Sequence, residues 1–311
     1  MRAYNRRPMH NPHRPDVLPM RDGVSPSCVV LPSRGEGTML DFLVQRLPAV
    51  GREDWLARMA AGDVVDERGA PVTPQRPFER GIRVFYYRHL PAEPELPFTE
   101  QVLYQDDHLL VADKPHFMPV TPGGRYLQNT LLVRLKRRLN LPDLSPLHRI
   151  DRDTAGLVLL SVCKATRGAY QALFRDHRIT KRYDAVAPWR PEVRFPREHV
   201  SRLKESAQFF RMEEVPGEAN SRTLMELDEI AVDRLWARYR LSPVTGKRHQ
   251  LRVHMAALGL PLRNDPFYPV VNDPPEGDFS RPLQLLARAL EFVDPLTGEQ
   301  RTFESRQRLV P

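Results

Sequence analysis

The sequence predicts an α+β protein with a mixed, mainly antiparallel sheet flanked by helices and loops, preceded by a small α/β domain. From residue 98 onward, short apolar or alternating segments are interrupted by single amphipathic helices and joined by tight turns. Residues 91–97 hold three prolines and two acids, a composition that interrupts helices and strands and is typical of a linker. We therefore expect an extended tail over residues 1–36, a small domain over 37–90, and a large domain over 98–311.

Composition narrows the function classes. The chain has 311 residues, is 41% hydrophobic and carries a formal charge of +8. Such a basic balance favours a polyanionic partner, with nucleic acid first and an anionic membrane surface second. Two cysteines rule out a disulfide framework or a cysteine zinc site and fit a reducing cytoplasm, where we expect the protein to act. No apolar run approaches the ~18 residues of a membrane span, and no secretory signal is present.

The N-terminal tail, residues 1–36, is rich in proline and arginine and shows neither helical nor alternating apolar spacing. Two interpretations stay open: loose contact with nucleic acid, or a solvated tail without a specific role.

The small domain begins with a helix signal. Thr38 and Asp41 form a capping pattern, and leucines recur at helical spacing up to residue 47. A second helix around Trp55 stops at Gly62, and a hairpin over 64–72 and a strand over 82–87 follow. The segment resembles the small RNA-binding domain of ribosomal small-subunit protein four. That resemblance rests on Leu40, Asp41, Phe42, Leu43, Arg52, Gly62, Val64, Gly69 and Gly81.

The large domain begins with a hairpin over residues 102–112 and a Pro/Gly-rich loop. A helix over 131–139 carries four cations, which suit either a phosphate backbone or a solvated helix face. Residues 188–222 are predicted to be rich in loops. The remaining expected elements are a strand over 157–162, a helix over 169–177, strands over 179–187, 224–230 and 235–241, a helix over 249–257 and a hairpin over 283–299.

One stretch concentrates charge beside a predicted core strand. Residues 148–153 are almost all ionisable, and the apolar run 158–162 follows within a few residues. Because charge is costly to bury, such groups at the edge of a core indicate an active site, although a charged turn has the same pattern.

Several chemistries are disfavoured by the motifs. The chain has no P-loop, dinucleotide fingerprint or serine nucleophile elbow. His249 and His254 are five positions apart, which misses the spacing of a helical zinc pair. Asp151 remains as the candidate catalytic residue. A carboxylate can attack a sugar carbon or assist the departure of a base from it. A guanidinium at ~4 Å, for which Arg252 is the candidate, attracts it by ~4 kcal/mol at an effective dielectric of ~20.

Residues 148–157 closely resemble the HRLDRDTSGL signature of the RluA-type pseudouridine synthases. Three further segments match in the same order, so that the resemblance covers roughly residues 98–305; they are 109–115, 181–186 and 245–254. The resemblance implies the pseudouridine synthase fold and isomerisation of uridines in structured RNA, rRNA or tRNA.

The resemblance also implies residue roles. Asp151 is the catalytic carboxylate that acts while the uracil is detached from C1′, turned and rejoined through C5, either by attacking C1′ or by removing the 2′ proton. Tyr183 is the stacking tyrosine, whose hydroxyl helps to remove the C5 proton, and Arg252 is the arginine partner of the aspartate.

Three neighbours of the aspartate are assigned to substrate binding. Arg149 matches the residue that enters the space left by the flipped nucleotide, because C1′ is inaccessible in a stacked helix. His148 is expected as a hydrogen-bonded support rather than an acid or base. Arg152, with Asp153, either binds RNA or braces the loop.

No cofactor or metal is implied, since the reaction involves neither redox change nor phosphoryl transfer. RNA is the expected partner of a monomer, with no protein or membrane partner. The departures from the family pattern are Ala155 for serine, Lys247-Arg248 for Arg-Thr, and Leu286 for histidine. They leave open a second hypothesis, a non-catalytic RNA-binding or ribosome-assembly protein that keeps the fold.

Overall fold

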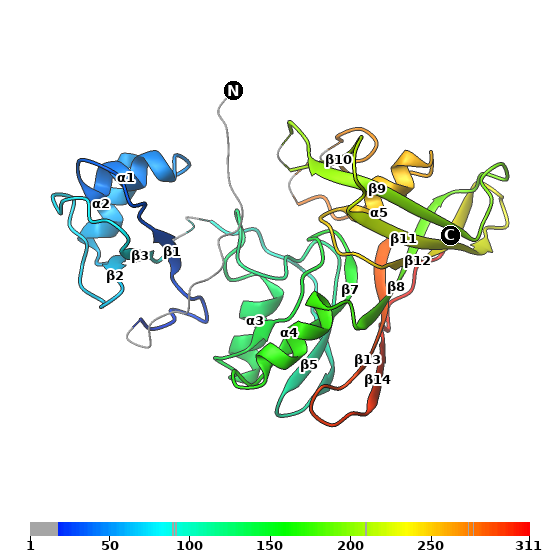
Figure 1. Ribbon diagram of the computed structural model, residues 1–311, viewed down its shortest axis with the longest axis horizontal. Coiled ribbons are helices and arrows are strands. Elements are labelled where there is room, and N and C mark those ends of the chain that lie inside the picture. Colours follow the sequence, from blue (N-terminus) through cyan, green and yellow to red (C-terminus); the bar gives the residue numbers. More distant parts are fainter. Residues whose placement is uncertain (1–17, 89, 91, 209, 273, 276) are drawn as a thin grey trace. The chain divides into compact units, whose positions relative to one another are not determined.

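The computed structural model describes residues 18–311, apart from residues 89, 91, 209, 273 and 276 (Figure 1). The chain divides into two compact units, of which the described parts are residues 18–93 and 94–311.

The N-terminal unit packs two helices on a small antiparallel sheet in the order β1-β3-β2. The expected capping pattern is present: the Thr38 hydroxyl accepts the Asp41 amide hydrogen, and the Asp41 carboxylate accepts from the Thr38 amide. Trp55 is fully buried in the core of this unit. The elements of this unit are β1 (Ser27–Val30), α1 (Met39–Arg46), α2 (Arg52–Ala60), β2 (Val64–Asp66) and β3 (Arg83–Tyr86).

The expectation of an extended tail over residues 1–36 is wrong for its second half. β1 pairs with β3, and Val29 and Leu31 are buried in the core of the unit. A four-residue strand among prolines is too short to show an alternating pattern, so its pairing depends on β3. The part of the expected tail over residues 1–17 lies outside the described residues.

The second unit is built around one sheet of eleven strands, ordered β10-β9-β11-β12-β8-β13-β7-β5-β4, with β14 on β13 and β6 on β7. Only the β13–β7 pair among these described strands is parallel. The first elements are β4 (Gln101–Gln105), β5 (Leu109–Lys114), α3 (Leu131–Leu139), β6 (Ser145–Pro146), β7 (Ala155–Ser161), α4 (Arg167–Arg175) and β8 (Ile179–Pro188). The others are β9 (Arg197–Glu205), β10 (Met212–Val215), β11 (Ser221–Ile230), β12 (Trp236–Pro243), α5 (Gln250–Ala257), β13 (Leu285–Val293) and β14 (Gln300–Glu304).

The helices cover the sheet where its strands are most apolar. Leu110 of β5 and Val158 of β7 pack in one cluster with α3, whereas Leu109 and Leu157 face the other way, into the cluster that holds α4. Every residue of β5 and β7 is consequently buried, which explains their continuous apolar runs. The helix α5 packs against β8, β11 and β12 in a third cluster.

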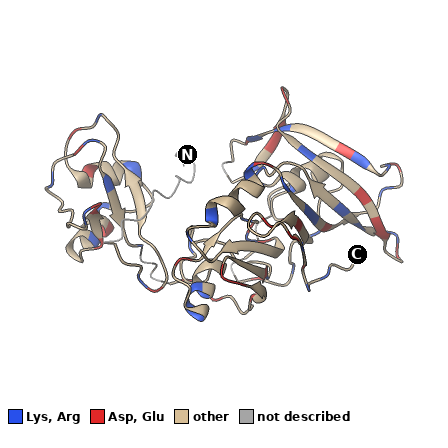
Figure 2. Ribbon diagram, turned by 60° about the horizontal axis from the view of Figure 1, so that its bottom comes forward, with Lys and Arg blue, Asp and Glu red and all other residues tan. Residues whose placement is uncertain are grey.

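The expectation of a loop-rich region over residues 188–222 is also wrong, because β9 and β10 lie there as the outer strands of the sheet. Their sequences are mostly polar, so they lack the apolar alternation that identifies a strand. Lysine, arginine, aspartate and glutamate interleave along this part of the sheet (Figure 2), and ion pairs such as Arg238–Asp228 and Arg240–Asp228 join β11 to β12.

The expected linker ends earlier than residue 97. Leu96 is buried in the core that contains α3, and the Pro94 carbonyl accepts a hydrogen bond from Asn129. On α3 itself, Arg134 and Arg138 both pair with the buried carboxylate of Glu100, so two of its four cations already have acidic partners. Among the described helices, none is long and apolar enough to cross a membrane.

Gly156 permits the one parallel junction of the sheet within the described residues. Its φ is +108°, a conformation that other residues rarely adopt, and an added Cβ would overlap the backbone of Ala287 on β13. This junction follows shortly after Asp151 in the chain and lies in the interior of the sheet.

We expect Gly156→Ala to lower the free energy of unfolding by about 3 kcal/mol, because it combines a strained φ with overpacking. Urea denaturation measures the change. Gly168→Ala is the matched control: Gly168 lies in α4 with open space around its Cβ position, so alanine should raise stability slightly. Equal stability of the Gly156→Ala variant and the parent would contradict the close approach.

Candidate active site

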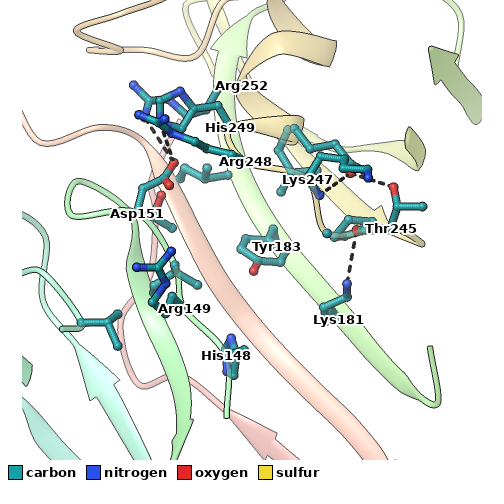
Figure 3. A pocket seen from close by; sticks show the side chains of 18 of the residues that line it. His148, Arg149, Asp151, Lys181, Tyr183, Thr245, Lys247, Arg248, His249 and Arg252 are labelled. Atoms are coloured by element: carbon teal, nitrogen blue, oxygen red, sulfur yellow. Dashed lines mark hydrogen bonds and ion pairs between the residues drawn. The ribbon is translucent and has the colours of Figure 1, made fainter. Parts of the chain in front are cut away.

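Three segments of the second unit converge on one open cavity of about 700 Å³ (Figure 3). Asp151 lies in the turn that leads into β7, Tyr183 on β8, and Arg252 on α5. Residues far downstream of Asp151 in the chain thus reach it through the fold. All six residues singled out from the sequence line this cavity: His148, Arg149, Asp151, Arg152, Tyr183 and Arg252.

Arg252 is the most constrained charged side chain of the cavity. It is 1% exposed, and its guanidinium donates two hydrogen bonds to Asp265, at 2.6 and 2.9 Å. A third nitrogen, Nη1, lies 3.2 Å from the Asp151 carboxylate. The rings of Phe267 and Tyr268 lie 5.0 and 5.4 Å from the guanidinium carbon. A bidentate pair of this kind fixes the direction in which the guanidinium presents its remaining donor.

Asp151 is kept ionised by this setting. Burial by itself raises the pKa of a carboxyl, but His249, when it is protonated at low pH, and the permanent charge of Arg252 outweigh it and hold the pKa of Asp151 below its usual value. The side chain of Asp151 is still 29% exposed, so the anion is accessible from the cavity. The arrangement therefore supplies a charged, accessible carboxylate at neutral pH.

Tyr183 has its phenol protonated. Burial and the Asp151 charge both raise the pKa of Tyr183 above the ordinary value. Its ring lies in the cavity between Asp151 and Lys181 (Figure 3). A phenol held in its neutral form can stack and hydrogen-bond, but this direction of shift opposes the expected action of its hydroxyl as a base toward C5.

His148 supports the backbone. Its Nε2 accepts a hydrogen bond from the Leu159 amide at 3.0 Å, and its ring stacks on Phe174. Burial, together with the charge of Lys181, lowers the pKa of His148 to about 3, so the imidazole is neutral. This geometry agrees with a hydrogen-bonded support and leaves Nε2 unavailable as a base.

Arg149 and Arg152 differ in their surroundings. Arg149 is exposed at the rim of the cavity and forms no hydrogen bond or ion pair within the described part of the chain. Arg152 donates to Asp153 at 2.8 Å, and its carbonyl accepts from Lys114. Of the two alternatives for Arg152, the contacts therefore favour bracing of the loop.

Four further residues shape the site, although the sequence assigned them no role in it. Asp265 orients Arg252, and His249 lies 3.8 Å from Asp151. Lys114 is fully buried and donates to the carbonyls of Pro115 and Met118, which follow β5, and of Arg152 in the loop before β7; burial lowers the pKa of Lys114 to about 7. Lys181 lies on the same face of β8 as Tyr183, two positions earlier. The matched segments carried a signal for His249, Lys114 and Lys181, whereas Asp265 lay in none.

A metal is not needed to explain the ionisable clusters. Among the described residues, His199, Glu214 and His254 form the single group whose spacing could hold an ion. However, His199 already bonds Glu214 at 2.7 Å, and both nitrogens of His254 meet hydroxyl groups, those of Thr223, Ser201 and Ser221. Hydrogen bonding thus accounts for the nitrogens that a metal would use.

Known proteins resemble this part of the chain. Residues 108–257 match the family model described as RNA pseudouridylate synthase. The dual-specificity RNA pseudouridine synthase RluA of Escherichia coli K12 is 33% identical over 221 residues, which cover 69% of this chain and 94% of that protein. An uncharacterized RNA pseudouridine synthase of Synechocystis is 31% identical over 240 residues, which cover 74% of this chain and 79% of that one. The chain belongs to the RNA pseudouridine synthase family.

The same part of the chain shares its fold with a solved structure. The solved structure of human RNA pseudouridylate synthase domain containing 1 superposes with a TM-score of 0.56 at 23% identity, over 70% of this chain and 86% of that one. The expected pseudouridine synthase fold, with a mixed and mainly antiparallel sheet, is confirmed. The synthase is accordingly an isomerase that converts uridine in RNA to pseudouridine. The N-terminal unit lies outside the matched residues 108–257.

The departures from the family pattern fall into two groups. Ala155 and Leu286 are direct partners across β7 and β13, and both are fully buried in one apolar cluster. These two positions therefore belong to the apolar core of the sheet. Lys247 and Arg248 line the cavity, and the Arg248 charge also lowers the pKa of Asp151. The second group therefore belongs to the cavity that holds Asp151.

The lowered pKa of His148 predicts how the stability of the protein depends on pH. His148 has a pKa of about 3 when folded and an ordinary value of 6.5, so the unfolded chain binds the additional proton. The contribution of His148 to the free energy of unfolding is complete above pH 6.5. It is lost as the pH falls from 6.5 toward 3, by about 1.4 kcal/mol per pH unit.

We expect His148→Gln to reduce the slope of unfolding free energy against pH between about 6 and 4 by about one proton. The glutamine oxygen retains an acceptor for the Leu159 amide. Urea titrations at several pH values measure the slope. His177→Asn is the control, because His177 is exposed and its positive φ of 53° suits asparagine. A slope unaffected by His148→Gln would show that His148 is not buried as a neutral group.

Proposed function

We propose that the cavity isomerises specific uridines in structured RNA, either rRNA or tRNA, with Asp151 acting at the ribose. One observation carries this proposal: an ionised, accessible carboxylate is held by a buried guanidinium in a cavity bordered by cations. A non-catalytic RNA-binding protein needs no such carboxylate, so the site favours catalysis over the second hypothesis.

The reaction balances within the substrate. The C1′–N1 bond breaks, the uracil turns, and C1′ bonds to C5; C5 loses a proton and N1 gains one. Asp151 attacks C1′ or removes the 2′ proton, and both routes require its ionised form. No electron acceptor or phosphoryl donor takes part, so we propose that the enzyme works without a cofactor.

The neighbouring residues take roles that suit their surroundings. We assign Tyr183 to stacking on the extruded uracil and Arg252 to holding the Asp151 anion in place. Arg149, exposed at the rim and without an intramolecular partner in the described chain, is suited to fill the gap left in the RNA stack. His148 and Arg152 support substrate binding indirectly, by shaping the loop that carries Arg149.

The N-terminal unit is the proposed second RNA contact. Its helices carry Arg46 and Arg58 near their C-terminal ends, and neither has an acidic partner among the described residues. Arg52 and Arg83, in contrast, pair with Asp41 and Glu67. Cations without acidic partners are available to phosphate, which supports RNA binding by this unit.

The proposal places the protein in the cytoplasm as a monomer that needs no protein partner. The unpaired state of Cys28 and Cys163 is compatible with a reducing compartment.

We expect Asp151→Asn to lower the turnover of a uridine-containing RNA by at least about 10³-fold while changing its affinity by less than about threefold. Asparagine keeps the shape of the side chain but removes the anion. Pseudouridine mapping of rRNA and tRNA from cells with the parent and variant genes identifies the target, and filter binding gives the affinity. Asp153→Asn, which alters the neighbouring loop anion, is the control. Retained isomerisation in Asp151→Asn would refute the assignment.

We expect the double substitution Arg46→Ala/Arg58→Ala to weaken RNA binding and to reduce the slope of log affinity against log salt by about 2, because each removed cation no longer neutralises a phosphate. Arg83→Ala is the control, because its charge is already paired. The measurement is a salt titration of affinity with the full chain. An unchanged slope would remove the N-terminal unit from the RNA interface.

A further inference from the structure

His249 occupies an unusual place beside the catalytic carboxylate. It precedes α5 with a φ of +52°, a left-handed conformation that is uncommon for a residue other than glycine. Its ring lies roughly parallel to that of Phe267 and edge-on to Tyr268. Nε2 lies 3.8 Å from the Asp151 carboxylate, whereas Nδ1 lies 2.9 Å from the Tyr268 hydroxyl. The two nitrogens therefore meet different partners.

The Tyr268 hydroxyl determines which nitrogen carries the proton. The Met212 amide donates to the phenol oxygen at 2.7 Å, so that oxygen already acts as an acceptor. The phenol has a single hydrogen, and no other described group that could accept it lies within hydrogen-bonding distance. Both groups are buried, where an unused donor costs about 1–3 kcal/mol. The arrangement that satisfies them all directs the phenol hydrogen to Nδ1.

We propose that Tyr268 is a positioning residue that selects the His249 tautomer with its proton on Nε2, so that an N–H group faces the Asp151 carboxylate. The proposal rests on the assignment of Asp151 as the group that acts at the ribose. The opposite tautomer would direct the Nε2 lone pair at an anion, which is repulsive.

The distance of 3.8 Å between His249 Nε2 and the Asp151 carboxylate determines how this donor acts on the anion. This distance is longer than a hydrogen bond, so the N–H dipole stabilises the ionised Asp151 carboxylate without fixing its position. Arg252 supplies the direct contact. Burial lowers the pKa of His249 to about 4, so the imidazole stays neutral beside Asp151 at neutral pH. A neutral imidazole whose Nε2 holds the proton cannot accept one there, so His249 assists Asp151 and does not compete with it as a base.

The segment that carries Tyr268 serves both partners of Asp151. Asp265 orients Arg252, and three residues later Tyr268 orients His249. The amides of Phe267 and Tyr268 donate to the Asp265 carboxylate, which ties the segment into one compact turn. A single loop outside the four matched motifs thus sets the direction of two donors toward the catalytic anion.

The tautomer is read directly by long-range ¹H–¹⁵N correlation of imidazole nitrogens in the full-length, histidine-labelled protein at neutral pH. Comparison with a His249→Gln sample assigns the signals among the 10 histidines. We expect Nε2 to be protonated and Nδ1 to be an unprotonated, hydrogen-bonded acceptor, and the Nδ1 resonance to move downfield in Tyr268→Phe. A protonated Nδ1 in the parent protein would overturn the proposal.

Kinetics tests whether the tautomer matters. We expect Tyr268→Phe to lower the single-turnover rate about tenfold, the value of one hydrogen bond, with RNA affinity within about threefold. Tyr239→Phe is the matched control: it also removes a buried phenol hydrogen bond, to the Pro188 carbonyl, away from the catalytic cavity. Melting temperatures of both variants reveal any general loss of structure.

The outcomes separate the two proposals. An unchanged rate in Tyr268→Phe, or an equal loss in Tyr239→Phe, would overturn the role of the tautomer. Activity retained by Asp151→Asn would instead refute the catalytic assignment while leaving the nitrogen spectra as expected.

Discussion

The site depends on one buried guanidinium that is shared between two carboxylates. Arg252 gives Asp265 two short hydrogen bonds and gives Asp151 a single longer one. This inequality has a chemical consequence, because Asp265 neutralises most of the arginine charge and leaves Asp151 ionised but loosely held. A carboxylate bound in a full bidentate pair would be equally ionised but less free to approach a ribose. The positive charges of the cavity rim, including Arg248, maintain the anion without enclosing it.

The sheet brings Asp151 and Tyr183 to the cavity that this guanidinium lines. Asp151 precedes β7, Tyr183 lies on β8, and β13 separates these strands in the sheet order. Gly156 permits the close approach of β7 to β13 just after the turn of Asp151. The adjacent residues Ala155 and Leu286 pair across the same junction and are buried in one apolar cluster. The close approach of the two backbones is therefore the constraint at this junction.

The elements that could be predicted are those whose pattern is local. The buried strands β5 and β7 have apolar runs, and α1 has its capping residues, so their sequences suffice. The strands β9 and β10 could not be found in this way, because outer strands with one solvated face are stabilised by pairing and by ion pairs between strands. The strand β1 is similar, because its burial depends on β3, which lies far along the chain.

For the site, the sequence by itself determined which reactive groups are present: the matched motifs contain Asp151, Tyr183, Arg252 and Arg149, together with the reaction class that they imply. Only the tertiary structure decided how these groups are charged and directed. The pairing of Arg252 with Asp265, the neutral state of His249 and the raised pKa of Tyr183 all follow from burial beside particular neighbours. Desolvation and hydrogen-bond direction belong to the assembled site, because they are set by atoms that are distant along the chain and adjacent only after folding.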